Sequence, residues 1–177
     1  MWRGKFLGIF MMENEQMNQQ EIYKFLTAQG IAYEITEHRA VYNMDGLADV
    51  NLPYPEADAK NLFVRDDKKH NYYLITIKGE KRVDLKEFAI AHGLRRLSFA
   101  SPEDLMRCLQ LLPGSVTPLG LLNNREKDVK FFLDGDFRED DLIGVHPNEN
   151  TATVWLKAGD LVRLVRRHGN EVDVVKV

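Results

Sequence analysis

The residues best suited to chemistry lie in three short segments that are far apart in the chain. The segments are residues 59–63 (AKNLF), 114–121 (GSVTPLGL) and 143–147 (IGVHP). The first contains a lysine, the second a glycine followed by two hydroxyl side chains, and the third a histidine. An ammonium group, backbone N–H groups and an imidazole can together stabilise an oxyanion and direct water toward an ester. If the fold brings the three segments together, they predict a small hydrolytic site.

In the first segment, Lys60 comes just before a hydrophobic run that is typical of a strand. Its ammonium could hold a phosphate or polarise an ester carbonyl at the mouth of a pocket. Asn61 could orient the same substrate by hydrogen bonds. Considered alone, a lysine at a strand end is more often a solvated side chain, and Asn61 could equally end a turn. The assignment of both residues to a site therefore depends on the other two segments.

The second segment predicts a loop after Pro113, in which Gly114 permits close backbone approach and Pro118 stiffens the exit. Such a loop can aim backbone N–H groups and the hydroxyls of Ser115 and Thr117 at an oxyanion. An ordinary connection between a helix and a strand is the alternative. The residues around Ser115 do not match the G-x-S-x-G elbow of serine hydrolases, which disfavours Ser115 as a nucleophile.

The third segment places Gly144 and His146 at the end of a predicted strand. An imidazole, whose ordinary pKa is about 6.5, can orient or deprotonate water near neutral pH. The structural alternative is a histidine that caps the sheet edge through one ring nitrogen. A serine esterase that uses Ser115 and His146 is a further, weaker interpretation.

Composition excludes several classes of protein. The chain has 177 residues, of which 44% are hydrophobic and 29% charged, as in an ordinary globular domain. The net charge is −3, from 24 basic and 27 acidic side chains, which argues against a DNA-binding protein with a broad basic face. No apolar run approaches the roughly 20 residues that cross a bilayer, so no membrane partner is expected.

Metal ions and disulfides are not expected either. The single cysteine, Cys108, cannot form an internal disulfide, which fits a reducing cytoplasm, and its leucine-rich neighbours predict a buried side chain. The five histidines lack the spacing of paired metal ligands. The acidic residues 134–141 lack the ligand periodicity of a calcium loop and are interpreted as a solvated turn. The sequence therefore predicts no metal and no cofactor.

The elements that must position these segments are helices and strands without a strict βαβ rhythm. Helices are expected from the cap Asn18 to Gly30, from the cap Asp84 through His92, and over residues 101–111 and 159–168, with a weak helix over 44–51. Strands are expected over residues 32–36, 61–65, 72–78, 97–99, 129–133, 142–145, 152–156 and 171–175. This pattern predicts an α+β fold, a single compact domain with a mixed, largely antiparallel sheet flanked by helices. Residues 1–16 are interpreted as a variable or non-native extension before a domain over residues 17–177, with Met17 as an alternative start.

In this order and spacing, the three segments resemble the YbaK/prolyl-tRNA-synthetase-associated editing domain family. The resemblance covers roughly residues 17–177 and is greatest to the free-standing members that deacylate mischarged tRNA(Pro), the alanyl-tRNA(Pro) deacylases. It implies hydrolysis of the ester between an amino acid and the terminal adenosine of tRNA, without a metal or a covalent intermediate. The implied partners are the 3′ end of aminoacylated tRNA, with tRNA(Pro) expected, and prolyl-tRNA synthetase.

The resemblance also assigns roles to residues. The predicted catalytic residues are Lys60, which would anchor the terminal nucleotide or the carbonyl, and His146, which would hold the substrate or water. The predicted substrate-binding residues would line the ester and the amino-acid pocket; they are Asn61, Gly114, Ser115, Thr117 and Gly144.

The resemblance makes alanyl-tRNA(Pro) the expected substrate. Editing of this kind is needed because a synthetase pocket sized for proline cannot strongly exclude a smaller amino acid. Missing methylene groups change the binding free energy by only ~1–3 kcal/mol. A second, smaller pocket that admits alanine and rejects proline would complete a double sieve. The alternatives are a deacylase for Cys-tRNA(Pro) or another small amino acid, and a non-catalytic module that binds tRNA or a synthetase.

Overall fold

The computed structural model describes residues 16–40 and 51–177. Nearly all of the predicted N-terminal extension (1–16) and of the predicted weak helix (44–51) lies outside these residues. The boundary predicted between residues 16 and 17 therefore stays a prediction. Within the described residues, none of the helices has both the length and the apolar character of a membrane span.

The four other predicted helices are present. They are α1 (Gln19–Ala28), α3 (Leu85–Ala91), α4 (Pro102–Leu109) and α5 (Ala158–His168). Asn18 and Glu21 form the predicted capping box at the start of α1, since each side chain accepts a hydrogen bond from the backbone N–H of the other. Asp84 caps α3 as predicted. The helix α4 ends before the predicted residue 111, because Gln110 adopts a left-handed conformation with φ of 53°.

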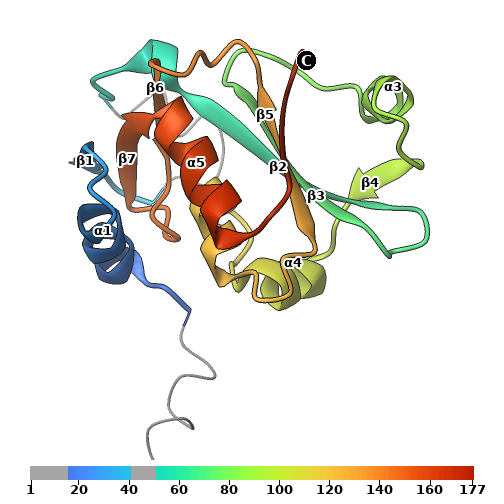
Figure 1. Ribbon diagram of the computed structural model, residues 1–177, viewed down its shortest axis with the longest axis horizontal. Coiled ribbons are helices and arrows are strands. Elements are labelled where there is room, and N and C mark those ends of the chain that lie inside the picture. Colours follow the sequence, from blue (N-terminus) through green and yellow to red (C-terminus); the bar gives the residue numbers. More distant parts are fainter. Residues whose placement is uncertain (1–15, 41–50) are drawn as a thin grey trace, which may run out of the picture.

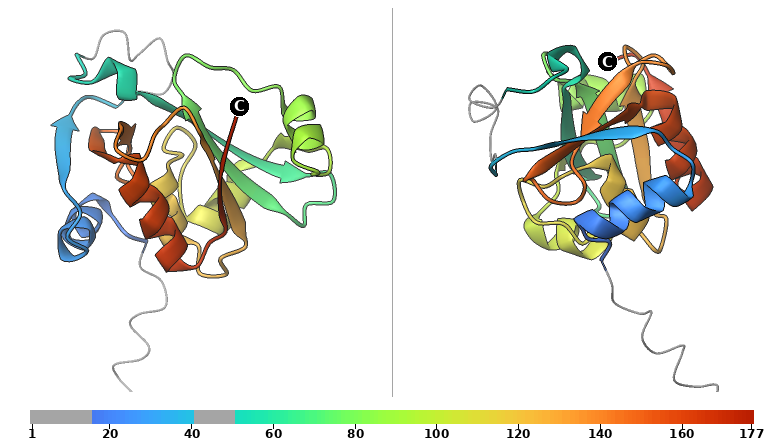
Figure 2. Two further views of the ribbon diagram at one scale, coloured as in Figure 1. Left: turned by 45° about the horizontal axis from the view of Figure 1, so that its top comes forward. Right: turned by 90° about the vertical axis from the view of Figure 1, so that its left-hand side faces the viewer.

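The strands divide into two sheets, which share one domain (Figures 1 and 2). They are β1 (Tyr33–Glu37), β2 (Ala59–Asp66), β3 (Tyr72–Lys78), β4 (Leu97–Phe99), β5 (Val129–Asp134), β6 (Leu142–Val145), β7 (Ala152–Lys157) and β8 (Val172–Val175). One sheet has the order β1-β7-β6, and the other has the order β4-β2-β3-β5-β8. The β3–β5 and β5–β8 pairs are parallel and the other pairs antiparallel, which confirms a mixed, largely antiparallel α+β fold.

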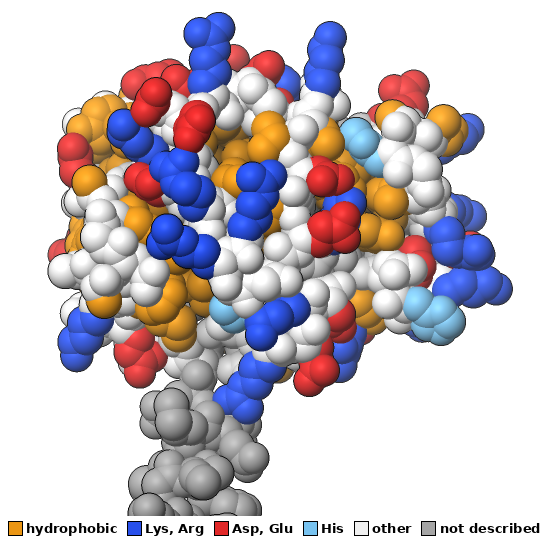
Figure 3. Space-filling model, in the orientation of Figure 1, with side chains coloured by type: hydrophobic (Ala, Val, Ile, Leu, Met, Phe, Trp, Pro, Cys, Tyr) orange, Lys and Arg blue, Asp and Glu red, His pale blue; other side chains and the backbone are white. Residues whose placement is uncertain are grey.

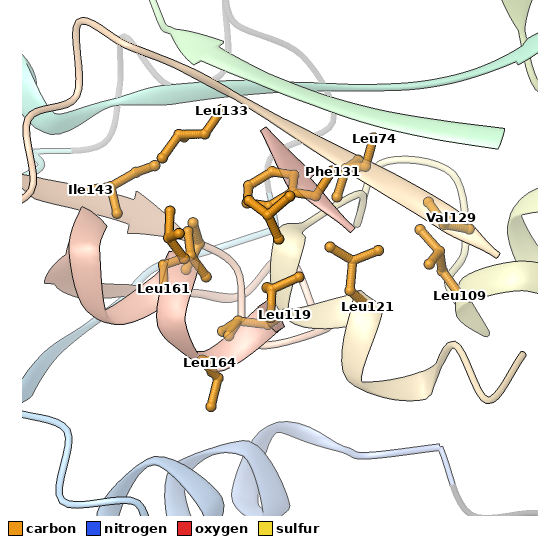
Figure 4. Packing of buried hydrophobic residues seen from close by; sticks show 14 of the residues in the cluster. Leu74, Leu109, Leu119, Leu121, Val129, Phe131, Leu133, Ile143, Leu161 and Leu164 are labelled. Atoms are coloured by element: carbon orange, nitrogen blue, oxygen red, sulfur yellow. The ribbon is translucent and has the colours of Figure 1, made fainter. Parts of the chain in front are cut away.

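Two hydrophobic cores hold the sheets and helices together. The larger core joins both sheets to α1, α4 and α5 and contains fully buried residues such as Phe131, Leu119 and Leu161 (Figure 4). Leu119 belongs to a 3-10 helix, η2 (Pro118–Asn123), which the sequence analysis did not predict. The smaller core lies where α3 packs on the five-stranded sheet, with Phe88 of α3 edge-on to Phe132 of β5. The sheet is therefore covered on both faces.

Two single-residue predictions have different outcomes. Cys108 is buried in the larger core as predicted, and burial raises the pKa of its thiol to about 11. The solvated turn predicted around residues 134–141 is wrong for Asp134, which is completely buried. Its carboxylate is stabilised there because it accepts hydrogen bonds from the backbone of Lys78 and Asp136 and pairs with Lys81.

Candidate active site

A partly buried hydrogen bond joins the second and third predicted segments. The Oγ1 atom of Thr117 donates to the backbone carbonyl of His146 at 2.7 Å. The same oxygen accepts the backbone N–H of Leu119 at 3.4 Å and so caps η2. Because the hydroxyl hydrogen is already donated, Thr117 contributes to the site by fixing the chain at His146.

The half-buried His146 ring is held in one tautomer. Its Nδ1 atom lies 3.0 Å from the carbonyl oxygen of Ala152. A carbonyl can only accept, so Nδ1 carries the hydrogen and Nε2 of the neutral ring keeps its lone pair. Burial lowers the pKa of His146, the bond to Ala152 raises it and the nearby His38 lowers it, with a net decrease. His146 is therefore neutral near pH 7 and can accept a proton from water.

His38 lies beside His146 and was not among the predicted site residues. The two rings are edge-on, with their centroids 6.1 Å apart. His38 Nδ1 faces the carbonyl oxygen of Arg39 at 2.8 Å, so Nε2 accepts from the hydroxyl of Thr153 at 3.0 Å. The antiparallel pairing of β1 with β7 creates this neighbourhood. The sequence offered one signal, a histidine two residues after the strand predicted over 32–36, and no indication of which strand would be its neighbour.

Lys60 and Asn61 point to opposite faces of the five-stranded sheet. Lys60 pairs with Ile77, which belongs to the smaller core under α3. The Nζ atom of Lys60 donates to the backbone carbonyl of Lys81 at 3.0 Å. Asn61 pairs with Thr76, whose Oγ1 donates to Asn61 Oδ1 at 2.6 Å. Among the described residues, no hydrogen bond links Lys60 to the other predicted site residues.

The start of β2 nevertheless lies near the third segment. β4 pairs only with residues 64–66 of β2, so it leaves the edge beside Lys60 and Asn61 uncovered. β2 contacts β6, and Figure 1 shows the start of β2 close to that strand. The start of β2, with Lys60 and Asn61, therefore lies near the strand that leads to His146.

Gly144 has a packing role that its residue type explains. It pairs with Trp155 across β6 and β7, and a Cβ atom at Gly144 would lie 2.5 Å from the Trp155 ring. The buried ring is also fixed by its Nε1, which donates to Thr36 Oγ1 at 2.9 Å, and by the edge-on ring of Tyr54. Gly144 is thus the residue that leaves room for Trp155 beside the candidate site.

Gly114 and Ser115 lie in a hydrogen-bonded turn after α4. Gly114 has φ of 90°, a left-handed conformation that favours glycine. The backbone N–H of Ser115 donates to the carbonyl of Leu112 at 3.1 Å, so this N–H is already used. Within the described residues, Ser115 forms no hydrogen bond with His146, which leaves a serine–histidine dyad without its defining contact.

The charged side chains of the described residues form neither a cluster of three or more metal ligands nor, on the face in Figure 3, a patch of one sign. In residues 16–40 and 51–177, no group of three or more His, Cys, Asp or Glu side chains is placed to hold a metal ion. On the face that Figure 3 shows, Lys and Arg side chains are interspersed with Asp and Glu.

Comparison with known proteins identifies the family. The model of the aminoacyl-tRNA editing domain matches residues 38–164, which include all seven predicted site residues and His38. The chain belongs to the aminoacyl-tRNA editing domain family. The predicted family and the predicted enzyme class, an aminoacyl-tRNA deacylase, are confirmed.

Relatives of this editing domain match over nearly their whole length. The prolyl-tRNA editing protein ProX of Acetoanaerobium sticklandii is 32% identical over 159 residues, which are 90% of this chain and 97% of ProX. The prolyl-tRNA synthetase associated domain-containing protein 1 of Mus musculus is 31% identical over 155 residues, 85% of this chain and 91% of the mouse protein. These matches extend beyond residues 38–164, so the chain resembles these proteins as a whole.

A solved structure shares the fold of the editing domain. It is described as a candidate trans-editing enzyme for prolyl-tRNA synthetase, and it superposes with a TM-score of 0.67 over 90% of this chain and 96% of its own. Only 20% of the residues are identical, so this likeness shows the fold alone.

Proposed function

We propose that this editing domain hydrolyses the aminoacyl ester of mischarged tRNA(Pro), with Ala-tRNA(Pro) as its preferred substrate. The observation that carries the proposal is the 32% identity to ProX, a prolyl-tRNA editing protein, over 97% of its length. The 3′ end of the charged tRNA is the proposed partner. Prolyl-tRNA synthetase is proposed as a second partner, since the mouse relative is named for its association with that enzyme. The cytoplasm, where a lone free thiol such as Cys108 stays reduced, is the proposed location.

The geometry supports direct attack by water. An aminoacyl ester is already activated, so a positioned water and a stabilised oxyanion can suffice without a covalent nucleophile. His146 is neutral, and its Nε2 is oriented because Ala152 holds Nδ1. In the proposed reaction Nε2 takes a proton as the water oxygen attacks the carbonyl carbon, and the imidazolium returns this proton to the tRNA ribose oxygen as the ester C–O bond breaks.

The oxyanion would be stabilised by hydrogen-bond donors that do not already donate to an acceptor within the described residues. The N–H of Ser115 and the hydroxyl of Thr117 both donate within the protein. The proposed donors are therefore the backbone N–H of Gly114, the hydroxyl of Ser115 and the ammonium of Lys60. Lys60 gives one of its three hydrogens to the Lys81 carbonyl, which leaves two for the substrate.

The position of β2 suggests where the substrate lies. Lys60 and Asn61 leave opposite faces of the strand, and β4 does not cover the edge beside them. A substrate that contacts both side chains must cross this edge, on the side of β6. In the proposed complex the terminal adenosine lies toward Lys60, and the amino acid lies toward Gly144 and His146.

Deacylation of three charged tRNAs by the purified protein tests the function. Ala-tRNA(Pro), Cys-tRNA(Pro) and Pro-tRNA(Pro) are compared at equal concentration. Selective loss of the alanyl ester is expected, and selective loss of the cysteinyl ester would replace alanine by cysteine in the proposal. No hydrolysis of any of the three would overturn it in favour of a binding module.

Replacing Lys60 tests the assigned site. We expect Lys60→Ala to lower kcat/KM at least about 100-fold, the usual loss when an oxyanion donor is removed. Lys68→Ala is the matched control, because Lys68 is an exposed lysine in the turn between β2 and β3. Equal thermal midpoints would show that both variants are folded. Full activity of folded Lys60→Ala would remove Lys60 from the mechanism.

A further inference from the structure

Lys81 connects the predicted catalytic lysine to a buried carboxylate. Its carbonyl oxygen accepts the hydrogen bond from Lys60 Nζ at 3.0 Å. Its own Nζ lies 2.9 Å from Asp134 Oδ1 and 2.7 Å from Asp136 Oδ2, and it donates to the backbone oxygen of Val177 at 3.1 Å. Lys81 therefore holds Lys60 through its backbone carbonyl, and the side chain of Lys81 is itself held by two carboxylates.

The side-chain anchor of Lys81 is strong because Asp134 is completely buried. The Asp134 carboxylate also accepts the N–H groups of Lys78 and Asp136, so its orientation is fixed from several directions. Burial lowers the pKa of Lys81, but pairing with Asp136 and Asp134 raises it more, with a net increase. Lys81 therefore stays charged at neutral pH, and a buried carboxylate keeps its counter-charge.

The backbone around Lys81 forms a tight turn, which fixes its carbonyl relative to its anchored side chain. The Lys81 N–H donates to the carbonyl of Lys78 at 3.0 Å, and the Gly79 N–H donates to the carbonyl of Asp58 at 2.9 Å. A Cβ atom at Gly79 would lie 2.6 Å from the Asp58 carboxylate, so the two segments are in close contact. This turn leaves the Lys81 carbonyl directed at Lys60.

We propose that Lys81 is a positioning residue for Lys60, which it holds through its backbone carbonyl while Asp134 and Asp136 hold its side chain. The inference rests on the proposed deacylase function and extends it to a residue outside the substrate pocket. A lysine side chain has four rotatable bonds, and holding one ammonium hydrogen restricts the directions of the other two. Lys81 thereby aims Lys60 without touching the substrate.

The kinetic test compares Lys81 with a lysine in a matched environment. Lys130 on β5 also pairs with two carboxylates, those of Glu171 and Asp173, and its side chain is 22% exposed against 25% for Lys81. We expect Lys81→Met to lower kcat about 10- to 100-fold, the range that small misplacement of a catalytic group produces, with a smaller change in KM. Lys130→Met should stay within about twofold of the parent, and Lys81→Arg, which keeps the charge, should recover most of the activity.

A second variant keeps the test valid if Lys81→Met does not fold, because that change leaves Asp134 buried without a cation. The double variant Lys81→Met with Asp134→Asn removes both charges and keeps similar volumes. It should fold and should still have reduced kcat, because the side-chain anchor is absent. Wild-type kcat in the folded double variant would overturn the proposal.

A readout independent of activity separates this inference from the proposed function. In protein with 13C-labelled lysine, a Lys60 side chain held in one position gives two distinct ε-proton resonances, which can be assigned with Lys60→Arg. We expect them to merge in Lys81→Met and to stay separate in Lys130→Met. Unchanged Lys60 resonances in Lys81→Met would overturn the positioning role even if kcat fell. If the parent protein hydrolyses none of the charged tRNAs, the proposed function is overturned. The resonances then still test whether Lys81 holds the Lys60 side chain.

Discussion

At the scale of single residues, the site depends on groups whose hydrogen-bonding capacity is already partly used. The hydroxyl of Thr117 and the Nδ1 of His146 both donate to backbone carbonyls. Within residues 16–40 and 51–177, no hydrogen bond occupies the Nε2 lone pair of His146, which is the basic position of the neutral ring. The site therefore resembles a preorganised receptor for water and an ester more than a nucleophile with its activating base.

The lowered pKa of His146 predicts a particular dependence of stability on pH. In the unfolded chain the pKa returns to about 6.5, and in the folded protein it is lower. Above pH 7 both states are neutral, and His146 contributes nothing. As the pH falls below about 6.5, the unfolded state binds the proton first, so the free energy of unfolding decreases by up to ~1.4 kcal/mol per pH unit until the folded pKa is passed.

Urea denaturation of the parent and of His146→Asn between pH 7.5 and 5 measures this effect. The other titrating groups are common to both proteins, so the difference between the two curves reports His146. We expect the difference in the free energy of unfolding to be constant above pH 7. Below pH 6.5 the parent should lose stability relative to His146→Asn. Parallel curves throughout would mean that His146 titrates normally in the folded protein.

At the scale of elements, sequence patterns located most helices and strands, but not the partner of β1. The strands predicted over residues 72–78 and 97–99 have the observed bounds, because apolar residues between flanking turns define them locally. The pairing of β1 with β7 depends on contacts between distant segments, so the approach of His38 to His146 could not be predicted.

Some features of the site were open to prediction and were missed. Alternation along a strand alone requires Lys60 and Asn61 to face opposite sides. Thr117 followed by Pro118 is a typical start of a helical turn, which is what η2 provides. Which face of β2 meets β6, and which carbonyl receives Lys60, follow from tertiary packing and were beyond a single sequence.

The capping box of α1 gives a prediction at this scale. Replacing Asn18 by Ala removes the acceptor for the Glu21 N–H and should reduce the free energy of unfolding by about 1 kcal/mol. Lys24→Ala is the control, since Lys24 is exposed on the same helix. Chemical denaturation compares the two variants. A stability of Asn18→Ala equal to that of Lys24→Ala would show that the cap contributes nothing measurable.

At the scale of the whole molecule, the larger core makes the two sheets one unit. Phe131 of the five-stranded sheet and Ile143 of the three-stranded sheet both belong to it, together with Leu161 of α5 (Figure 4). Residues of both sheets lose their packing partners if either sheet opens. Unfolding should therefore be a single cooperative transition.

Truncation of a core side chain tests this coupling. Leu161 is completely buried, so Leu161→Ala should reduce the free energy of unfolding by about 2–5 kcal/mol. Ile90, which is 72% exposed, is the control, and Ile90→Ala should change stability by less than about 0.5 kcal/mol. Denaturation followed by both fluorescence and circular dichroism should give coincident curves. Separate transitions would indicate that the sheets unfold independently.

The order of strands along the chain has a consequence for synthesis on the ribosome. β1 is made before any strand of the five-stranded sheet, but its neighbour in the described structure is β7, which is made after β5. A nascent chain that ends before Ala152 therefore exposes β1 without its partner and carries His38 far from its eventual neighbour. The histidine side of the site therefore assembles only after β7 has been synthesised.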